Sequence, residues 1–155
     1  MVTLKQLTMD DLEQITNVFE KAIWQTANAD YTTEQLRVWS AAGADPSRWF
    51  QMIQNDYTIG AFERVTLTGF GSLCGSNYLD MLYVSPDYQG SGIAGSIAKK
   101  LIDRAAEMGA SQIHTNASQT AVPFFQSIGF ELGERHVFAL NGVEIFNYRM
   151  TLGYA

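Results

Sequence analysis

Hydrophobic positions near the start of the chain repeat first at strand spacing and then at helical spacing. A short alternating run at residues 2–7 predicts a strand, and Thr8 with Asp11 resembles a capping box, the usual side-chain arrangement at a helix start. The apolar positions that follow share one helical face: Leu12, Ile15, Val18, Phe19, Ala22 and Ile23. The pattern therefore predicts a strand followed by an amphipathic helix.

Two further helix starts are predicted before the pattern changes. Thr32 has Gln35 three residues later, and Asp45 is followed by Pro46, which is tolerated in the first turn of a helix. Trp39 and Trp49 are among the apolar positions that these helices would carry. The N-terminal third is expected to be mostly helical.

The middle of the chain changes to short runs of strand-forming residues. These runs cover residues 57–62, 66–73 and 78–84, and short polar or glycine-containing turns separate them. We expect three consecutive antiparallel strands.

The last part of the chain alternates between helix and strand and ends in a hairpin. A helix is expected from Ile93 to Ala105, stopped by Gly109, and Asn141-Gly142 predicts a tight turn. The remaining expected elements are a strand at 112–116, a short helix at 121–127, and hairpin strands at 130–140 and 143–152. This order predicts a mixed α/β sheet with helices on both faces.

Composition indicates a folded, acidic protein. The chain has 155 residues, of which 46% are hydrophobic and 17% charged, so we expect a single domain over residues 1–155. Its net charge of −6 is unfavourable for binding a nucleic acid, because phosphates attract cationic surfaces. No apolar run has the length of a signal peptide or a spanning helix, so we expect a cytoplasmic protein without a membrane partner.

The cysteine and histidines offer little support for a metal site or a covalent mechanism. Cys74 is the single cysteine, and no His or Lys adjoins it in sequence, so it is expected to be buried and inert. His114 and His136 lack the spacing of metal ligands, and no metal site is predicted.

A glycine-rich turn at residues 89–95 joins an expected strand to the most regular predicted helix. The first N–H groups of a helix lack intrahelical partners, and small residues let a phosphate approach them closely. Three interpretations of this turn follow from its glycines alone. The turn could be a loop that binds a nucleoside triphosphate, but it lacks the Lys that such a loop needs to reach the phosphates. It could be a dinucleotide-binding loop, but the next strand lacks the acidic residue that would bind a ribose. It could also be a tight structural turn that binds no ligand.

The order Gln89-x-x-Gly92-x-Ala94 after an apolar strand resembles the GNAT superfamily of N-acetyltransferases. A second segment at 121–130 is similar to that family's signature of a short helix ending in Gly-Phe, and the resemblance extends over about residues 57–152. It implies a GNAT-like, mostly antiparallel sheet and binding of acetyl-CoA, with the pyrophosphate at the glycine-rich turn and the pantetheine arm along the preceding strand. The implied cofactor residues are Leu82, Tyr83, Val84, Gln89, Gly90, Ser91, Gly92, Ile93, Ala94, Ser118 and Phe125.

Two of these positions depart from the family pattern. Ser118 stands where the family often has Asn, and its hydroxyl can still form a hydrogen bond with the cofactor. Phe125 stands where the family often has a Tyr that protonates the leaving thiolate. Since Phe125 has no proton to donate, we expect it to form a wall beside the thioester and the thiolate to leave without an acid at that position.

Acetyl transfer to an amine requires a base, and an acid can assist it. Asp80, in an apolar strand, is the carboxylate best placed by sequence to be the base. Tyr83 and Tyr78 are alternative acids, but a separation of five residues puts them on opposite faces of a regular strand. Trp24, Tyr31 and Trp39 are the candidate residues for binding the acceptor substrate, and Asp80 and Tyr83 are the catalytic candidates.

These observations favour an acetyl-CoA-dependent N-acetyltransferase acting directly on an amine of a small molecule or peptide in a ternary complex. A catalytically weak acyl-CoA-binding regulator is the alternative, motivated by Phe125. A nucleotide-dependent oxidoreductase would use the same glycines. The chain could act as a monomer or as a homodimer.

Overall fold

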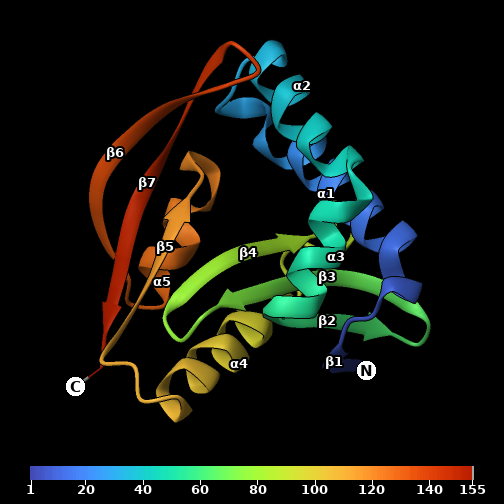
Figure 1. Cartoon of the computed structure of the whole chain (residues 1–155), viewed down its shortest axis with the longest axis vertical. Helices are drawn as coiled ribbons and strands as arrows, with labels where there is room; N and C mark the ends of the chain where they lie inside the picture. Colours follow the sequence, from blue (N-terminus) through green and yellow to red (C-terminus); the bar gives the residue numbers. More distant parts are fainter. Residues whose placement is uncertain (155) are drawn as a thin grey trace.

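A computed structural model describes residues 1–154, which form one seven-stranded sheet with helices packed on it (Figure 1). The strands are β1 (Val2–Gln6), β2 (Tyr57–Glu63), β3 (Thr66–Cys74), β4 (Tyr78–Val84), β5 (Gln112–Ala117), β6 (Glu131–Leu140) and β7 (Val143–Gly153). Their order in the sheet is β1-β2-β3-β4-β5-β7-β6. Neighbouring strands are antiparallel except β4 and β5, which are parallel.

The helices begin where the sequence predicts them. They are α1 (Leu12–Thr26), α2 (Thr33–Ala41), α3 (Pro46–Asn55), α4 (Ile93–Glu107) and α5 (Val122–Ser127). Thr8 and Thr32 both form complete capping boxes, and the Asp45 carboxylate accepts a hydrogen bond from the Ser47 N–H. A 3-10 turn at Met9–Asp11 separates the first cap from α1.

Helices cover both faces of the sheet and create two hydrophobic cores. The first core joins α1, α2 and α3 to one face and contains Phe19, Trp49 and Phe70, all fully buried. The second joins α4 and α5 to the other face and contains Ile97 and Leu101. The predicted mixed, mostly antiparallel sheet between helical layers is therefore confirmed.

The sheet separates into two parts between β4 and β5. These strands pair only through Tyr78 with His114 and Leu79 with Thr115. The rest of β4, residues 80–84, has no partner on the edge that faces β5. In Figure 1 the strands β1–β4 and the strands β5–β7 diverge from this junction. The divergence opens the space in which the predicted site residues gather.

No helix within residues 1–154 is both long and apolar enough to cross a membrane.

Candidate functional site

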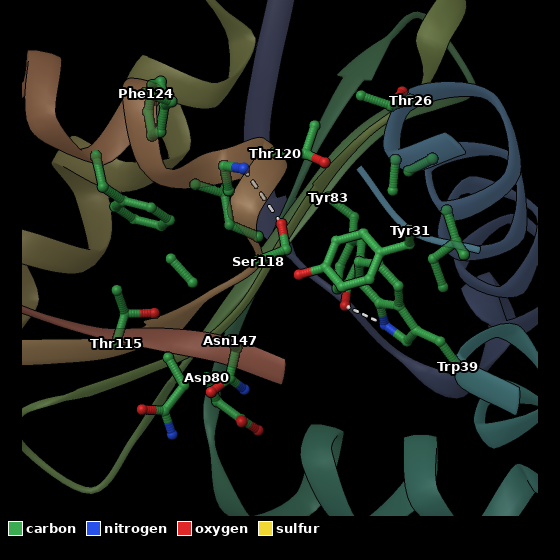
Figure 2. Close-up of a pocket in the computed structure, with 18 of the residues that line it drawn as sticks. Thr26, Tyr31, Trp39, Asp80, Tyr83, Thr115, Ser118, Thr120, Phe124 and Asn147 are labelled. Carbon is green, nitrogen blue, oxygen red and sulfur yellow. Dashed lines mark hydrogen bonds between the residues drawn. The ribbon is translucent and has the colours of Figure 1, made fainter. Parts of the chain in front are cut away.

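A cavity of about 560 Å³ occupies the divergence between β4 and β5. Its walls come from α1, α2, α3, β4, the start of α4, the end of β5, α5 and the β6–β7 hairpin. Figure 2 shows side chains from both parts of the sheet around it. Ten of the residues predicted for the site line it: Tyr31, Trp39, Asp80, Leu82, Tyr83, Val84, Gln89, Ala94, Ser118 and Phe125.

The glycine-rich turn forms an open loop at the N-terminus of α4. Gly90 and Gly92 have φ angles of 78° and 81°, and no atom lies within 4 Å of a Cβ built on either. Gly92 is the N-cap of the 15-residue α4 and has no side chain to satisfy the first N–H groups. The loop can therefore present those N–H groups to an anion.

Two side chains of the loop form hydrogen bonds with the backbone of the protein itself. Gln89 donates from Nε2 to the carbonyl of Val84 at 3.1 Å, and the Ser91 hydroxyl donates to the carbonyl of Tyr88. Ile93 is the first residue of α4 and its side chain is buried in the second core, so the prediction that it binds cofactor can hold only for its backbone. Gly90, Ser91, Gly92 and Ile93 do not line the cavity themselves but follow one another between Gln89 and Ala94, which do.

The free edge of β4 and the opposing α5 form a channel that leads from this loop. Residues 80–84 have no β5 partner, so backbone groups on that edge can pair with an extended amide-containing chain. Phe125 is buried and lines the channel, and the Ser118 hydroxyl accepts a hydrogen bond from the Ala121 N–H at 3.2 Å (Figure 2). The open loop and the free edge together fit the phosphate and the pantetheine parts of coenzyme A.

Asp80 lies at a β-bulge in the middle of β4. Ser72 pairs with Met81 and Leu73 pairs with Leu79, which leaves Asp80 as the extra residue. Its carboxylate remains accessible through the cavity. Surrounding protein atoms nevertheless raise the pKa of Asp80 by desolvation, and the Arg48 charge and a hydrogen bond with Tyr78 only partly offset that shift. A raised pKa makes this carboxylate a stronger base than an ordinary aspartate.

The bulge also changes which tyrosines face the cavity. Leu79 and Leu82 pack in the core beside α4, whereas Met81 and Tyr83 pack in the core beside α1. The alternation of faces is thus reversed at Asp80, and Tyr78 and Tyr83 both line the cavity. The expectation that they lie on opposite faces was wrong, because it assumed a regular strand.

Tyr83 is held in a row of aromatic rings. Its ring lies 4.9 Å from that of Phe19 and 5.7 Å from that of Phe70, and its hydroxyl accepts a hydrogen bond from Trp39 Nε1 at 3.3 Å (Figure 2). Burial raises the pKa of Tyr83 to about 12. The hydroxyl therefore keeps its proton at ordinary pH and can donate a hydrogen bond.

The candidate residues for the acceptor substrate are only partly brought together. Tyr31 and Trp39 line the cavity with their rings 5.3 Å apart. The Tyr31 hydroxyl donates to the carbonyl of Phe146 at 3.0 Å and accepts from the Gln119 N–H at 2.9 Å. Trp24 does not line the cavity: it is 38% exposed on α1 and donates from Nε1 to Ser40 Oγ. The prediction that Trp24 belongs to this site was wrong, because the apolar face of α1 does not include it.

Cys74 is exposed at the end of β3, so the prediction of a buried cysteine was also wrong. Local desolvation and the charge of Asp56 raise the pKa of the Cys74 thiol, which lowers the thiolate fraction. The expectation of an unreactive thiol therefore rests on local surroundings and charge rather than on deep burial.

Several polar residues of the cavity were missed from the sequence, among them Arg48 on α3 and Asn147 on β7. Arg48 gives no signal, because it lies between the buried Trp49 and an exposed turn of α3. Asn147 gives a weak one: it follows Val143 and Ile145 at alternate positions after the predicted turn, which places it on the same inward face.

Known proteins match this chain over nearly all of its length. The family model of the acetyltransferase (GNAT) domain matches residues 27–152. The uncharacterized N-acetyltransferase YafP of Escherichia coli (strain K12) is 29% identical over 149 residues, which cover 96% of this chain and 94% of YafP.

Solved structures match equally widely. A GCN5-related N-acetyltransferase from Rhodopseudomonas palustris has a TM-score of 0.95 and 29% identity, covering 98% of this chain and 95% of that one. The PaiA N-acetyltransferase from Thermoplasma acidophilum, crystallised with coenzyme A, has a TM-score of 0.81 and 19% identity, covering 99% of both chains. The stretch that the family model matches includes β4, α4, β5 and α5, which border the cavity.

Proposed function

Since the chain belongs to the GNAT acetyltransferase family, we propose that it transfers the acetyl group of acetyl-CoA to an amine by direct attack in a ternary complex. One observation carries the proposal: the same cavity runs along a free strand edge, reaches Gln89 and Ala94 on either side of the glycine-rich turn, and contains a carboxylate with a raised pKa. The first two features suit the cofactor, and the third suits the amine.

The cofactor residues proposed are those of β4, the glycine-rich loop and α5. The N–H groups at the start of α4, from Gly92 onward, would bind the pyrophosphate, and the free edge of Leu82–Val84 would hold the pantetheine arm. Ser118 would donate its hydroxyl proton to the arm, since its oxygen already accepts from Ala121. Acetyl-CoA held by these residues would supply an activated acetyl thioester, and Phe125 is one of the residues that line the same cavity.

Asp80 is proposed as the general base, directly or through a water. An amine arrives largely protonated, so a proton must leave before its nitrogen can attack. Asp80 takes one proton from the ammonium and passes it to solvent. The neutral nitrogen then forms a bond to the acetyl carbon as the carbon–sulfur bond breaks, and its second proton passes to the departing sulfur, directly or through water, so that coenzyme A is released as the thiol. Asp80 is suited to this role because it is both accessible and more basic than usual.

Tyr83 is proposed to orient and stabilise rather than to act as a strong acid. Its pKa of about 12 lies well above the value of about 8.5 for a simple thiol, so full proton transfer to a thiolate is unfavourable. A hydrogen bond from the same hydroxyl would still stabilise negative charge on oxygen or sulfur. Phe125 excludes water from this region without taking part in proton transfer.

The test is to incubate the purified protein with acetyl-CoA and a panel of amines while measuring free thiol. We expect thiol release that depends on the amine, with the acetylated amine identified by mass spectrometry. Coenzyme A binding without turnover of any amine would instead favour an acyl-CoA-binding regulator. Acetylation of the protein itself before the amine is added would contradict direct transfer.

A further inference from the structure

We propose that the acceptor substrate is an amino acid with an apolar side chain, whose carboxylate binds Arg48 and whose amino group lies between Asp80 and Asn147. This inference rests on the proposed acetyl transfer and specifies the substrate of the same site. Three features of the acceptor half of the cavity support it, one for each part of such a molecule.

The first feature is a cation in the cavity without an anionic partner. Arg48 is half-buried and lines the cavity, and its guanidinium lies 5.2 Å from the ring centre of Phe19 and 5.3 Å from that of Trp49. The ion pairs within residues 1–154 are Lys21–Asp87 and Lys99–Asp103, so no described carboxylate lies within ion-pairing distance of Arg48.

These contacts hold Arg48 in place without neutralising it. The two rings contact the guanidinium but occupy none of its five N–H donors, which match a carboxylate in geometry. The charge of Arg48 lowers the pKa of Asp80, so the two side chains are near each other, but they do not form an ion pair. The space between them would accept a molecule that carries both charges.

The second feature is an unpartnered oxygen. Asn147 Oδ1 is buried in the cavity wall and accepts no hydrogen bond from the described residues. A buried carbonyl without a donor is costly, so its natural partner is an N–H group of the ligand. Figure 2 draws Asn147 in the same part of the close-up as Asp80, and both line the cavity from different strands. The two oxygens together would bind an amino group.

The third feature is an apolar wall in the same cavity. Tyr31 packs on Trp39 and stacks on Phe146 with ring centres 4.9 Å apart, and Phe138 and Leu140 extend the wall along the hairpin. Such a surface suits an aliphatic or aromatic side chain.

Other amine classes would satisfy fewer of these groups. A polyamine would bring a second cation towards Arg48, and a peptide N-terminus would offer it a neutral amide in place of a carboxylate. Either would leave the guanidinium without an anion in a partly desolvated site. A free amino acid supplies the anion, the amine and the apolar body at once.

The test uses matched acceptors that differ only at the carboxylate. We would measure kcat/KM for L-phenylalanine, L-phenylalaninamide and phenethylamine, and repeat the comparison with the leucine series. We expect the free acids to be preferred by about 10- to 100-fold, the range expected for hydrogen bonds to a charged group. Arg48→Met should reduce that preference to about onefold, and Arg48→Lys should leave an intermediate value, because it keeps the charge but loses the planar pair of donors.

Arg37→Met is the matched control, because Arg37 is exposed on α2 outside the cavity and its loss changes the net charge equally. It should keep the parent preference. Calorimetric titration of the coenzyme A complex with L-phenylalanine and with its amide gives the same comparison without turnover.

Equal or better use of the amide, phenethylamine or spermidine would overturn the assignment while leaving acetyl transfer intact. A loss in Arg48→Met that is the same for acid and amide would also overturn it, since Arg48 would then act only through Asp80. Preferential calorimetric binding of the acid without turnover of any amine would support the assignment and contradict the proposed transfer.

Discussion

At the scale of single residues, Asp80 combines an irregular backbone with an unusual pKa. The bulge directs its carboxylate into the cavity, and desolvation raises its pKa there. A base works only when deprotonated, so kcat/KM should fall as the pH drops through the raised pKa, above the ordinary value of about 3.9. Asp80→Asn should lower kcat/KM by about 10²- to 10⁴-fold and remove this acid limb. Asp103→Asn on α4, remote from the cavity, should retain it.

The stability of the same variant separates a catalytic effect from a folding defect. A carboxyl whose folded pKa is raised destabilises the folded state where it is ionised, and this cost disappears below the unfolded pKa of about 3.9. Asp80→Asn should therefore unfold at a higher temperature than the parent at pH 7, with the gain vanishing in acid. A lower melting temperature at pH 7 would mean that the activity loss reports damage to the fold.

The sequence predicted single residues well where the backbone is regular and poorly elsewhere. Tyr31, Trp39 and Tyr83 were found because large aromatic residues at regular positions face a core or a cleft. The sequence did not predict that Tyr78 and Tyr83 both line the cavity, because a bulge leaves no mark in the residue pattern. Arg48 was missed because its role depends on rings from α1 and α3 and on a carboxylate from β4, which only the tertiary structure brings together.

At the scale of elements, the boundaries were predictable because each is fixed by local chemistry. The Thr8 and Thr32 capping boxes, Asp45 before Pro46, and the Asn141-Gly142 turn are contacts among near neighbours in sequence. The divergence of β4 from β5 is different in kind. It depends on where two strands that are distant in sequence stop pairing, at Leu79 and Thr115, which are 36 positions apart, and no local pattern encodes that point.

The loop before α4 allows a test at the level of one helix. Gly92 and Gly109 flank the two ends of α4, both with positive φ (81° and 86°), and no atom lies within 4 Å of a Cβ built on either. Valine at either position should cost stability by about 1–2 kcal/mol, because the left-handed backbone disfavours a Cβ. Only Gly92→Val should also weaken coenzyme A binding, by about tenfold or more in a calorimetric titration, since its side chain would block the N–H groups. Equal affinities in the two variants would exclude this loop as the phosphate site.

At the scale of the whole molecule, coenzyme A should act as a bridge between the two parts of the sheet. Strands β1–β4 and β5–β7 pair through only two residue pairs, and the cavity between them is lined from both sides. A ligand at 100 times its dissociation constant stabilises the folded state by about 2.7 kcal/mol, equivalent to about 5–10 °C in melting temperature for a chain of this size. Thermal unfolding with coenzyme A should show that shift, and NAD at the same concentration should not. A rise in melting temperature with NAD alone would instead favour the dinucleotide interpretation of the three glycines. If the rise with coenzyme A is lost in Gly92→Val and kept in Gly109→Val, the stabilisation of the entire fold comes from binding at the start of α4.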